Sequence, residues 1–386
     1  MRILHLCLSN FYVDGFSYQE NELVRQNVED GHEVRVIAST EQIATDGTLF
    51  YSRPSAYLGR DGAMVERVAY ARFLPHAVMR KLRIHGSIYR RIEAFRPDVI
   101  LFHSACGYEI LTAAKYVRDH PEVTLFVDSH EDFMNSARGL VSKWALHYAY
   151  YRPILLHALP QIAKVLPVNL SALEFMRDFY GVPADKLEFY PLGGTVPGDE
   201  DYAALRRAKR EELAVPPDAI MLVQSGKLDR SKKLIEALEA FTRTSDQRLR
   251  FVIAGRVHTQ IAEQVDALIA RDNRITAVGW QSGDELRALM CAADVYCQPG
   301  TQSSTMQMAI CCRCAILLDD VPSHGPYLAG NGWLVGDRKD LERRMAELAS
   351  CSRADLDRMA SASLELALRM LDYRLLAARL YRQQQT

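Results

Sequence analysis

Residues 219–242 read AIMLVQSGKLDRSKKLIEALEAFT. An apolar run at 219–224 leads into Gly226 and Lys227, and an amphipathic segment begins at residue 233. A short buried strand that passes through a glycine-containing loop into a helix is the repeating unit of a parallel α/β sheet. The stretch therefore predicts a doubly wound α/β fold, with the lysine-rich loop at the carboxyl edge of its sheet.

The same alternation continues toward the C-terminus. Strand patterns occur at 248–254, 275–278, 295–298 and 315–318, and helical patterns occur at 261–271, 284–292 and 304–311. From residue 339 onward the pattern is helical throughout. These elements predict a Rossmann-like domain over 196–365, followed by a helix at about 366–386 that is long enough to return to the first half of the chain.

The N-terminal half shows a second set of such elements. A helical pattern lies at 19–30, and strand patterns lie at 3–8, 33–38, 99–102, 124–127 and 164–168. Glycine, proline and acidic residues concentrate at 192–201, which is typical of a surface connection. We therefore predict a Rossmann-like domain over 1–195 that is joined by the C-terminal helix. The two sheets are expected to face a central cleft, with ligands bound beyond the carboxyl ends of the strands.

Composition and charge exclude several classes of protein. The chain has 386 residues, of which 48% are hydrophobic and 25% charged, as in packed soluble domains. Its 47 basic and 48 acidic side chains give a net charge of -1, which offers no general attraction to nucleic acid. The first ten residues, MRILHLCLSN, are unlike a signal peptide, and no apolar run approaches the ~18 residues that span a bilayer. We expect a cytoplasmic protein.

The eight cysteines are interpreted as reduced, mostly buried thiols. Three of them lie close together, at Cys311, Cys312 and Cys314, yet a cytosolic protein keeps such thiols reduced and packs them as small apolar residues. We expect no metal site.

Two loops carry the residues best suited to ligand binding. Lys227 and Lys232 stand five residues apart at the start of a helix, where they and the helix dipole suit a diphosphate. The second loop, 298–307, reads QPGTQSSTMQ and offers backbone N–H groups, hydroxyls and amides for a phosphate or a sugar. A solvated helix start and an ordinary capped loop are the structural alternatives.

These loops, taken with three further motifs, resemble the C-terminal domain of family-four retaining glycosyltransferases. The motifs are Gly279-Trp280, Asp284-Glu285-Leu286 and Ala293-Asp294-Val295-Tyr296. Residues 1–38 resemble the first βαβ unit of the same family, and 14–21 (DGFSYQEN) and 299–307 resemble a branch found in bacterial capsule and surface-polysaccharide gene clusters. The resemblance covers nearly the whole chain. It implies a GT-B fold and a retaining, metal-independent hexosyltransferase.

The resemblance also implies residue roles and partners. Lys227 and Lys232 match the basic pair that holds the donor diphosphate, and His130 matches the histidine that approaches the transferred sugar. The donor is expected to be a UDP-sugar or GDP-sugar used as co-substrate, with no cofactor, and the acceptor a glycan or a lipid-linked glycan. Donor-binding positions are Gly15, Gly226, Arg256, Trp280, Gly300, Thr301, Gln302, Ser303, Ser304 and Gln307. Acceptor-binding positions are Asp14, Phe16, Ser17 and Asp132.

One departure from the family pattern leaves alternatives open. The family shows two glutamates with seven residues between them, and Pro299 and Gln307 occupy the matching positions. Gln307 retains a hydrogen-bonding group for ribose, whereas Pro299 has none. The alternatives are an inactive relative, a non-catalytic nucleotide-sugar-binding partner of another transferase, and a nucleotide-sugar epimerase. A dehydrogenase is disfavoured, because 9–16 contains a single glycine.

Two segments suggest contact with the inner face of a membrane. A basic stretch with apolar neighbours includes Arg80–Arg91, and an aromatic stretch spans Trp144–Tyr151. A solvated helix with its apolar side in the core explains the basic stretch equally well. Near the strand ends, core or surface roles are expected for His5, His103 and Glu109, and Glu131 is a helix-start acid or an acceptor contact.

Overall fold

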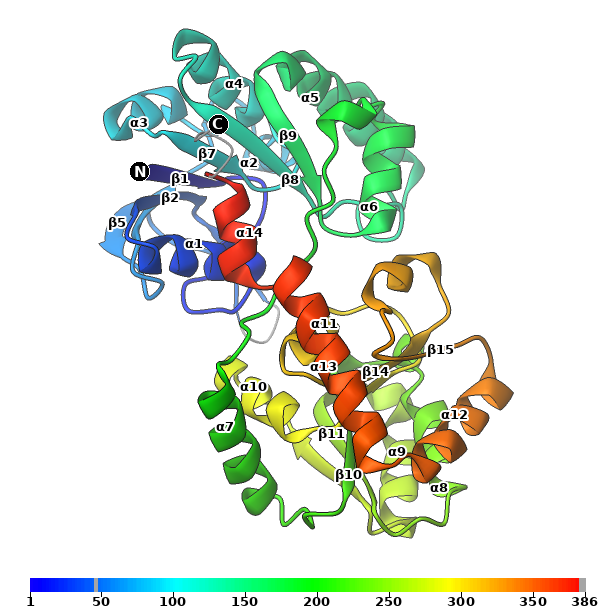
Figure 1. Cartoon of the computed structure of the whole chain (residues 1–386). Coiled ribbons are helices and arrows are strands. Elements are labelled where there is room, and N and C mark those ends of the chain that lie inside the picture. Colours follow the sequence, from blue (N-terminus) through cyan, green and yellow to red (C-terminus); the bar gives the residue numbers. More distant parts are fainter. Residues whose placement is uncertain (45–47, 382–386) are drawn as a thin grey trace. The chain divides into compact units, whose positions relative to one another are not determined.

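The computed structural model describes residues 1–44 and 48–381, and the chain forms two compact units (Figure 1). Unit 1 comprises Met1–Leu192 and the chain from Leu376 onward, and unit 2 comprises Gly193–Leu375. The sequence placed this boundary between residues 195 and 196. The last part of the expected C-terminal helix, 382–386, lies outside the described residues.

Unit 1 is built on a seven-stranded sheet in the order β5-β6-β2-β1-β7-β8-β9. All neighbours pair in parallel except β5 and β6. The central strands are buried on both faces, which explains their continuous apolar runs. The strands are β1 (Arg2–Cys7), β2 (Glu33–Ser39), β5 (Ser55–Leu58), β6 (Met64–Val68), β7 (Val99–Phe102), β8 (Thr124–Ser129) and β9 (Ile162–Pro167), and a separate hairpin contains β3 (Glu41–Ile43) and β4 (Leu49–Tyr51).

The helices of unit 1 pack around this sheet and close its core. The α-helices are α1 (Gln19–Glu29), α2 (His76–Leu82), α3 (Ile88–Phe95), α4 (Glu109–Asp119), α5 (Arg152–Ala158) and α6 (Leu170–Glu174). Wider helical turns form η1 (Ser142–Tyr151) and η3 (Phe175–Phe179), and short 3₁₀ turns form η2 (Leu159–Gln161) and η4 (Ala184–Lys186). The core contains side chains from β1, β7, β8, α4 and α5.

Unit 2 is a second Rossmann-like body with a six-stranded sheet in the order β12-β11-β10-β13-β14-β15. Every pair is parallel, so the carboxyl ends of all six strands lie at one edge. The strands are β10 (Ile220–Leu228), β11 (Leu249–Val257), β12 (Ile275–Gly279), β13 (Val295–Gln298), β14 (Ala315–Asp319) and β15 (Gly332–Val335). The helices are α7 (Asp199–Glu212), α8 (Leu234–Thr242), α9 (Thr259–Arg271), α10 (Gly283–Ala292), α11 (Ser304–Cys311), α12 (Arg338–Ser350) and α13 (Arg353–Met370), with 3₁₀ turns η5 (Arg230–Lys232) and η6 (Pro322–Tyr327).

The expected surface connection at 192–201 is shorter than predicted, because α7 begins at Asp199. Asp199, Glu200 and Asp201 occupy the first turn of this helix, where carboxylates complement the helix dipole. A cluster of acids that indicated a loop is therefore a helix start. The helical tail is also interrupted, since α13 ends at Met370 and α14 (Tyr373–Arg379) begins after Asp372, whose carboxylate accepts a bond from the Arg374 N–H at 3.0 Å.

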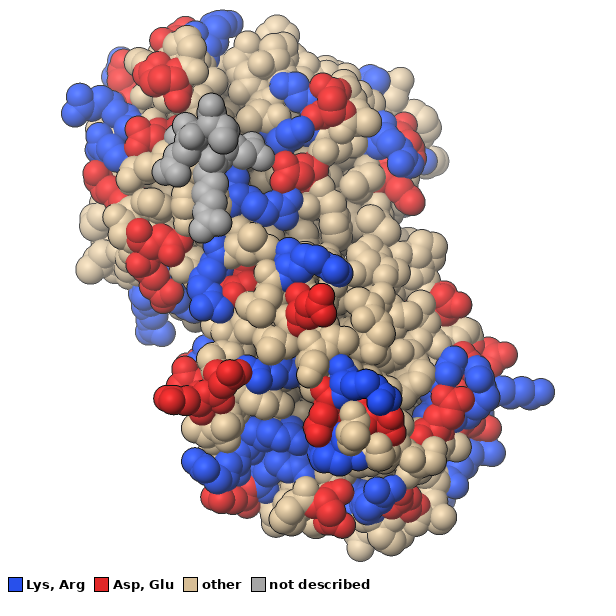
Figure 2. Space-filling model, viewed as in Figure 1, with Lys and Arg blue, Asp and Glu red and all other residues tan. Residues whose placement is uncertain are grey.

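Basic and acidic side chains are interspersed over the face shown in Figure 2, in keeping with the net charge of -1. Within the described ranges, no helix has the length and apolar content needed to cross a membrane.

Candidate functional site

Unit 2 brings the two predicted loops into direct contact at the carboxyl edge of its sheet. The Thr301 N–H donates to the Ser231 carbonyl at 3.0 Å. A Cβ atom on Gly300 would lie 2.2 Å from the Ser231 carbonyl oxygen, a distance that real contacts do not reach. Gly300 is therefore required for the approach of the two backbones, and the loops form one surface.

Lys232 holds the second loop through its ammonium group. Its Nζ donates to the carbonyls of Thr301 at 2.8 Å and Gln302 at 3.0 Å. Both acceptors are neutral. Burial lowers the pKa of Lys232, and nearby Asp229 opposes this shift only in part. A positive charge held among neutral groups in a half-buried position is stabilised further by an anionic ligand.

Lys227 lies at the same sheet edge, one strand from Arg256. The two residues are direct neighbours in the β10–β11 pairing, and both side chains are exposed. A Cβ atom on Gly255 would lie 2.0 Å from the Gly226 carbonyl oxygen, so glycine is needed between the strands here. Trp280, 64% exposed, follows β12 directly. Lys227, Arg256 and Trp280 thus follow one another across three strand ends.

The start of α11 carries a cluster of hydroxyl groups. The Tyr296 hydroxyl lies 2.7 Å from Thr305 Oγ1, and the Ser303 hydroxyl donates to Gln298 Oε1 at 3.0 Å. Ser304 remains exposed, whereas Gln307 is fully buried, 3.2 Å from the Tyr327 hydroxyl. The loop therefore presents Thr301 and Ser304 outward, and Gln307 lies beneath them.

Unit 1 contains a buried chain of hydrogen bonds across its central strands. Asn27 Nδ2 lies 2.9 Å from His5 Nε2, and His5 Nδ1 lies 3.0 Å from His103 Nε2. His103 Nδ1 is bonded in turn to Asp128 Oδ2 at 2.5 Å. Burial and the neighbouring His103 lower the pKa of His5, whereas Asp128 raises the pKa of His103 despite its burial. This series of hydrogen bonds ends on the buried carboxylate of Asp128, at the carboxyl end of β8.

Ser104 connects this series of hydrogen bonds to Glu131. Its φ of 78° is left-handed, which is rare for serine, and its N–H donates to Asp128 Oδ1 at 2.7 Å. Its hydroxyl donates to Glu131, which also accepts bonds from the Ser129 hydroxyl at 2.8 Å and the His130 N–H at 3.1 Å. Strained residues of this kind concentrate at functional sites.

His130 lies beside Asp128 and is about one-third exposed. Its Nε2 is 3.8 Å from Asp128 Oδ1 and has no hydrogen-bond partner among the described residues. Asp132, the predicted acceptor contact, instead accepts bonds from the N–H groups of Met134 and Asn135, each at 2.7 Å. Its carboxylate closes a turn.

The loop after β1 carries the remaining predicted positions. Asp14 accepts a bond from the Arg60 N–H at 2.8 Å, and Gly15 has a left-handed φ of 78°. Phe16 packs its ring against Tyr18, and Ser17 is exposed. The structure thus groups these residues on one surface loop of unit 1.

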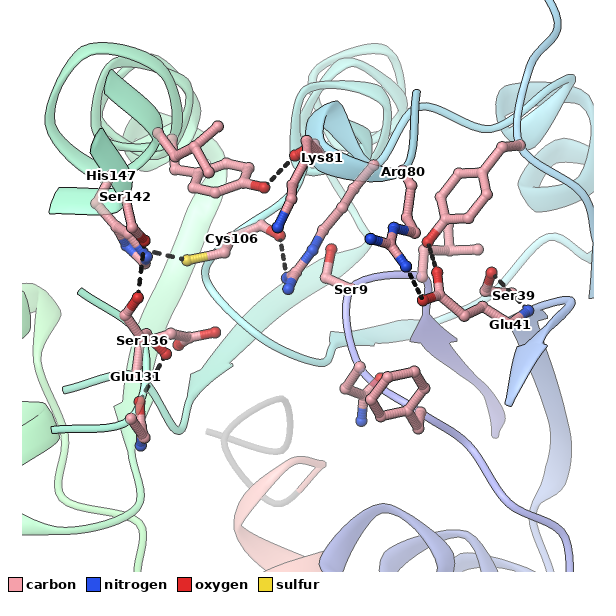
Figure 3. A pocket seen from close by; sticks show the side chains of 18 of the residues that line it. Ser9, Ser39, Glu41, Arg80, Lys81, Cys106, Glu131, Ser136, Ser142 and His147 are labelled. Atoms are coloured by element: carbon pink, nitrogen blue, oxygen red, sulfur yellow. Dashed lines mark hydrogen bonds and ion pairs between the residues drawn. The ribbon is translucent and has the colours of Figure 1, made fainter. Parts of the chain in front are cut away.

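A cavity of about 450 Å³ opens in unit 1 beside Glu131. Figure 3 shows Glu131, Ser136, Ser142 and His147 to one side of Lys81, and Arg80, Glu41 and Ser39 to the other. Arg83 donates to the Cys106 carbonyl at 2.6 Å. The sequence placed Arg80, Lys81 and Arg83 in a basic surface stretch. In the structure Arg83 follows α2 with a left-handed backbone (φ 54°), and its side chain reaches Cys106.

The cysteines are free thiols, as predicted, and seven of the eight are buried. Over residues 1–44 and 48–381, no group of three or more histidine, cysteine, aspartate or glutamate side chains is arranged to hold a metal ion.

Two Rossmann-like units with these loops define the class of fold, and solved structures match the chain over its length. The first is HepE of Anabaena in complex with UDP, which is 13% identical with a TM-score of 0.68 over 100% of both chains. A glycosyltransferase of Rickettsia africae is 14% identical with a TM-score of 0.70, over 100% of this chain and 97% of that one. WaaG, a glycosyltransferase involved in lipopolysaccharide biosynthesis, is 14% identical with a TM-score of 0.62, over 98% and 100% of the chains. The predicted GT-B fold is confirmed.

Family models then identify the two domains. Residues 15–193 match Glycosyltransferase Family 4, and residues 219–351 match Glycosyl transferases group 1. The chain is therefore a glycosyltransferase of the family 4 and group 1 type. No protein of curated function matches its sequence.

Proposed function

We propose that the protein transfers a hexose from a nucleotide diphosphate donor to a glycan or lipid-linked acceptor, with retention of configuration and without a metal ion. We further propose that the donor is a UDP-sugar and that the transfer belongs to surface polysaccharide biosynthesis. HepE was solved with UDP and also with UDP-glucose, and WaaG is involved in lipopolysaccharide biosynthesis. These neighbours support the choices as analogies of fold.

The observation that carries the proposal is the contact between the two loops of unit 2. Lys232 joins the loop after β10 to the loop before α11 by donating to two neutral carbonyls, and nearby Asp229 compensates its charge only in part. Lys227 adds a second cation at the same sheet edge, and this one is exposed. Two cations and the N-terminal N–H groups of α11 suit the two negative charges of a diphosphate.

The proposed chemistry requires little of the protein beyond charge and position. In a retaining transfer on one face of the sugar, the leaving diphosphate itself assists the incoming hydroxyl, and no protein nucleophile takes part. Lys227 and Lys232 stabilise the charge that develops on the leaving phosphate. His130, whose Nε2 lies 3.8 Å from Asp128 Oδ1 and makes no hydrogen bond within the described ranges, is the proposed contact to the sugar.

The test is release of nucleotide from a panel of UDP-sugars and GDP-sugars, measured with and without EDTA. We expect release with one donor, insensitivity to EDTA, and a loss of about 100-fold to 1000-fold in turnover in Lys232→Ala, because one charge-assisted contact in the transition state is removed. Lys339→Ala, an exposed lysine on α12, is the matched control and keeps full activity. Sensitivity to EDTA would contradict the metal-independent step.

Pro299 and Gln307 motivate a second candidate, a non-catalytic nucleotide-sugar-binding protein. The position of Gln307 favours it, because a fully buried amide beneath the loop does not reach a ribose as the family glutamate does. Donor binding by calorimetry without any nucleotide release, even when lipid-linked acceptors are added, would select this candidate over a transferase.

We also propose peripheral contact with a membrane. In the basic stretch Arg80–Arg91, Arg80 pairs with Glu41 and Arg91 with Glu66, and Arg90 remains exposed. The segment before and within η1 is more strongly apolar. Leu140, Val141 and Trp144 are 78%, 76% and 51% exposed, and the Lys143 ammonium lies 5.4 Å from the Trp144 ring centre. Exposed aliphatic and indole groups beside a cation suit the surface of an anionic bilayer.

Sedimentation with anionic vesicles tests this contact. The double variant Leu140→Ser with Val141→Ser is expected to lose most of the bound fraction. Leu368→Ser removes a leucine that is 51% exposed on α13 and is expected to bind as the unaltered protein does. Equal binding of all three proteins would refute the contact.

A further inference from the structure

The cavity of unit 1 carries an excess of positive charge at one wall. Arg80, Lys81 and Arg83 all line it, and they come from one short stretch at the end of α2. The lining residues include two carboxylates, Glu41 and Glu131. This leaves one more cation than carboxylate around a space of about 450 Å³, a size suited to a small ligand.

Both carboxylates already accept hydrogen bonds from other groups of the protein. Glu41 accepts a bond from the Tyr70 hydroxyl at 2.6 Å and lies 3.9 Å from Arg80. Glu131 accepts bonds from the Ser104 and Ser129 hydroxyls and the His130 N–H. Among the described residues neither carboxylate forms a close ion pair with Lys81 or Arg83, although the Glu131 charge still acts on Arg83 and contributes to its raised pKa.

Lys81 and Arg83 lack an ion pair among the described residues. Arg83 donates to two neutral oxygens, the Cys106 carbonyl at 2.6 Å and the Ser104 hydroxyl at 3.3 Å. The Lys81 side chain is exposed and reaches into the cavity opening in Figure 3. Two cations that form no close ion pair within the described ranges, at the wall of one cavity, favour an anionic ligand.

The cationic wall is held in place before any ligand binds. The Tyr150 hydroxyl donates to the Leu82 carbonyl at 3.1 Å, and the Tyr151 hydroxyl donates to the Lys81 carbonyl. These bonds fix the end of α2 to η1, which supplies the facing residues Ser142 and His147. A fixed wall binds with a smaller entropic cost than a mobile one.

The facing walls carry neutral polar groups. Asn135, Ser136 and Ser142 contribute amide and hydroxyl groups, and Ser9 and Asn10 add two more from the loop after β1. Ser9 Oγ and Asn10 Oδ1 are buried without a hydrogen-bond partner in the described part of the chain. Neutral donors and acceptors opposite a cationic wall suit a sugar that bears an anionic group.

We propose that this cavity is the acceptor site and that it selects an acceptor carrying a phosphate or diphosphate, with Lys81 and Arg83 on the phosphate oxygens and the hydroxyl and amide groups on the sugar. The inference rests on the proposed transfer function and names the chemical class of its acceptor. The phosphate belongs to one of two sources, a prenyl-linked sugar diphosphate or a soluble sugar phosphate.

Calorimetry on the full chain tests the proposal with three probes. They are glucose 1-phosphate, neutral glucose, and a short-chain prenyl-linked sugar diphosphate. We expect at least one phosphate probe to bind about ten times more tightly than glucose, and its affinity to fall with added salt. Lys81→Ala is expected to weaken that probe about tenfold, and Lys115→Ala, an exposed lysine on α4 away from the cavity, to leave it unchanged. Tighter binding of the prenyl-linked probe identifies the lipid source, and equal binding identifies the soluble one.

A second variant and a donor control separate the possible failures. Arg83→Lys keeps the charge but loses the guanidinium fork, and it is expected to weaken the phosphate probe while leaving glucose unaffected. UDP binding is measured on every variant and is expected to stay constant. Phosphate probes that bind no better than glucose, or that ignore both variants, would overturn the inference when UDP still binds. Absence of UDP binding by the unaltered protein would instead overturn the proposed function.

Discussion

Ser104 donates hydrogen bonds to two buried carboxylates of unit 1, those of Asp128 and Glu131. Its left-handed backbone aims the N–H at Asp128 and the hydroxyl at Glu131, so one residue orients two buried carboxylates. A β-carbon in this region costs about 1 kcal/mol or more, and the surrounding bonds must offset that cost.

We predict that Ser104→Ala destabilises unit 1 more than Ser104→Gly does. Both variants lose the hydroxyl bond to a carboxylate, which costs about 2 kcal/mol, but only glycine relieves the strain, by about 1 kcal/mol. Urea unfolding of both variants measures the difference.

Ser87→Gly is the control for strain alone, because exposed Ser87 has a φ of 62° and makes no side-chain capping bond. It is expected to stabilise the unit slightly. A Ser104→Ala variant as stable as the unaltered protein would show that the hydroxyl bond to Glu131 contributes nothing.

At the scale of elements, Asp294 joins two helices of unit 2 to its sheet. Its side chain is 1% exposed, and Arg206 of α7 and Arg353 of α13 each reach its Oδ1 at 2.6 Å. Its Oδ2 accepts a bond from the Met221 N–H of β10 at 2.8 Å. One carboxylate thus holds α7, α13 and the sheet together.

We predict that Asp294→Asn costs about 3 kcal/mol, because buried and half-buried guanidinium groups lose their counter-charge. Asp284→Asn, which breaks an exposed pair with Arg287, is expected to cost about 0.5 kcal/mol and serves as the matched control. Equal losses in the two variants would contradict this role of Asp294.

The ion pairs of Asp294 with Arg206 and Arg353 also predict that the stability of unit 2 depends on pH. Burial disfavours the Asp294 carboxylate, yet Arg206 and Arg353 outweigh burial and hold its pKa below the ordinary value. A carboxyl with a depressed folded-state pKa stabilises the fold above its unfolded pKa of about 3.9, and the contribution is lost as the pH falls from there through the folded pKa. The stability difference between Asp294→Asn and the unaltered protein should therefore be full at pH 7 and shrink below about pH 4 in urea titrations.

The junction of the two loops in unit 2 depends on a single glycine. Gly300→Ala places a methyl group against the backbone of Ser231 and Lys232, which has no room for it. We predict a loss of about tenfold or more in UDP affinity, measured by calorimetry, because the loops move apart. Gly336→Ala, at a site with nothing within 4 Å of the added atom, is the control. Unchanged UDP affinity in Gly300→Ala would separate the loop contact from donor binding.

At the scale of the whole molecule, the two proposed ligands are expected to bind to different units. UDP is expected to slow hydrogen exchange at 225–233 and 298–305, and a phosphate-bearing acceptor is expected to slow it at 80–83 and 131–147. Exchange monitored by mass spectrometry resolves these segments. Protection of 80–83 by UDP alone would contradict the assignment of the cavity to the acceptor.

The strongly patterned elements of both sheets follow from the sequence. β7, β13 and α11 have the predicted bounds, because their short apolar or amphipathic runs alternate as expected in a parallel α/β sheet. The strand β6, with the sequence MVERV, carries no such pattern, since its Arg67 is buried through bonds to the carbonyls of Tyr12 and Ser39. Local patterns do not reveal a buried charge whose partners lie far along the chain.

The sequence by itself determined the two-domain α/β class, the family type, and the positions of Lys227, Lys232 and Gly300 at strand-to-helix loops, because strand–loop–helix order and glycine placement are local properties. Only the tertiary structure decided that Lys232 binds the second loop, that Gln307 is buried, and that Lys81 and Arg83 line a cavity. These features depend on contacts between segments up to 70 residues apart, as between Lys232 and Gln302, and on left-handed backbone turns at Arg83 and Ser104. Distant contacts are fixed by packing, and no local run of residues encodes them.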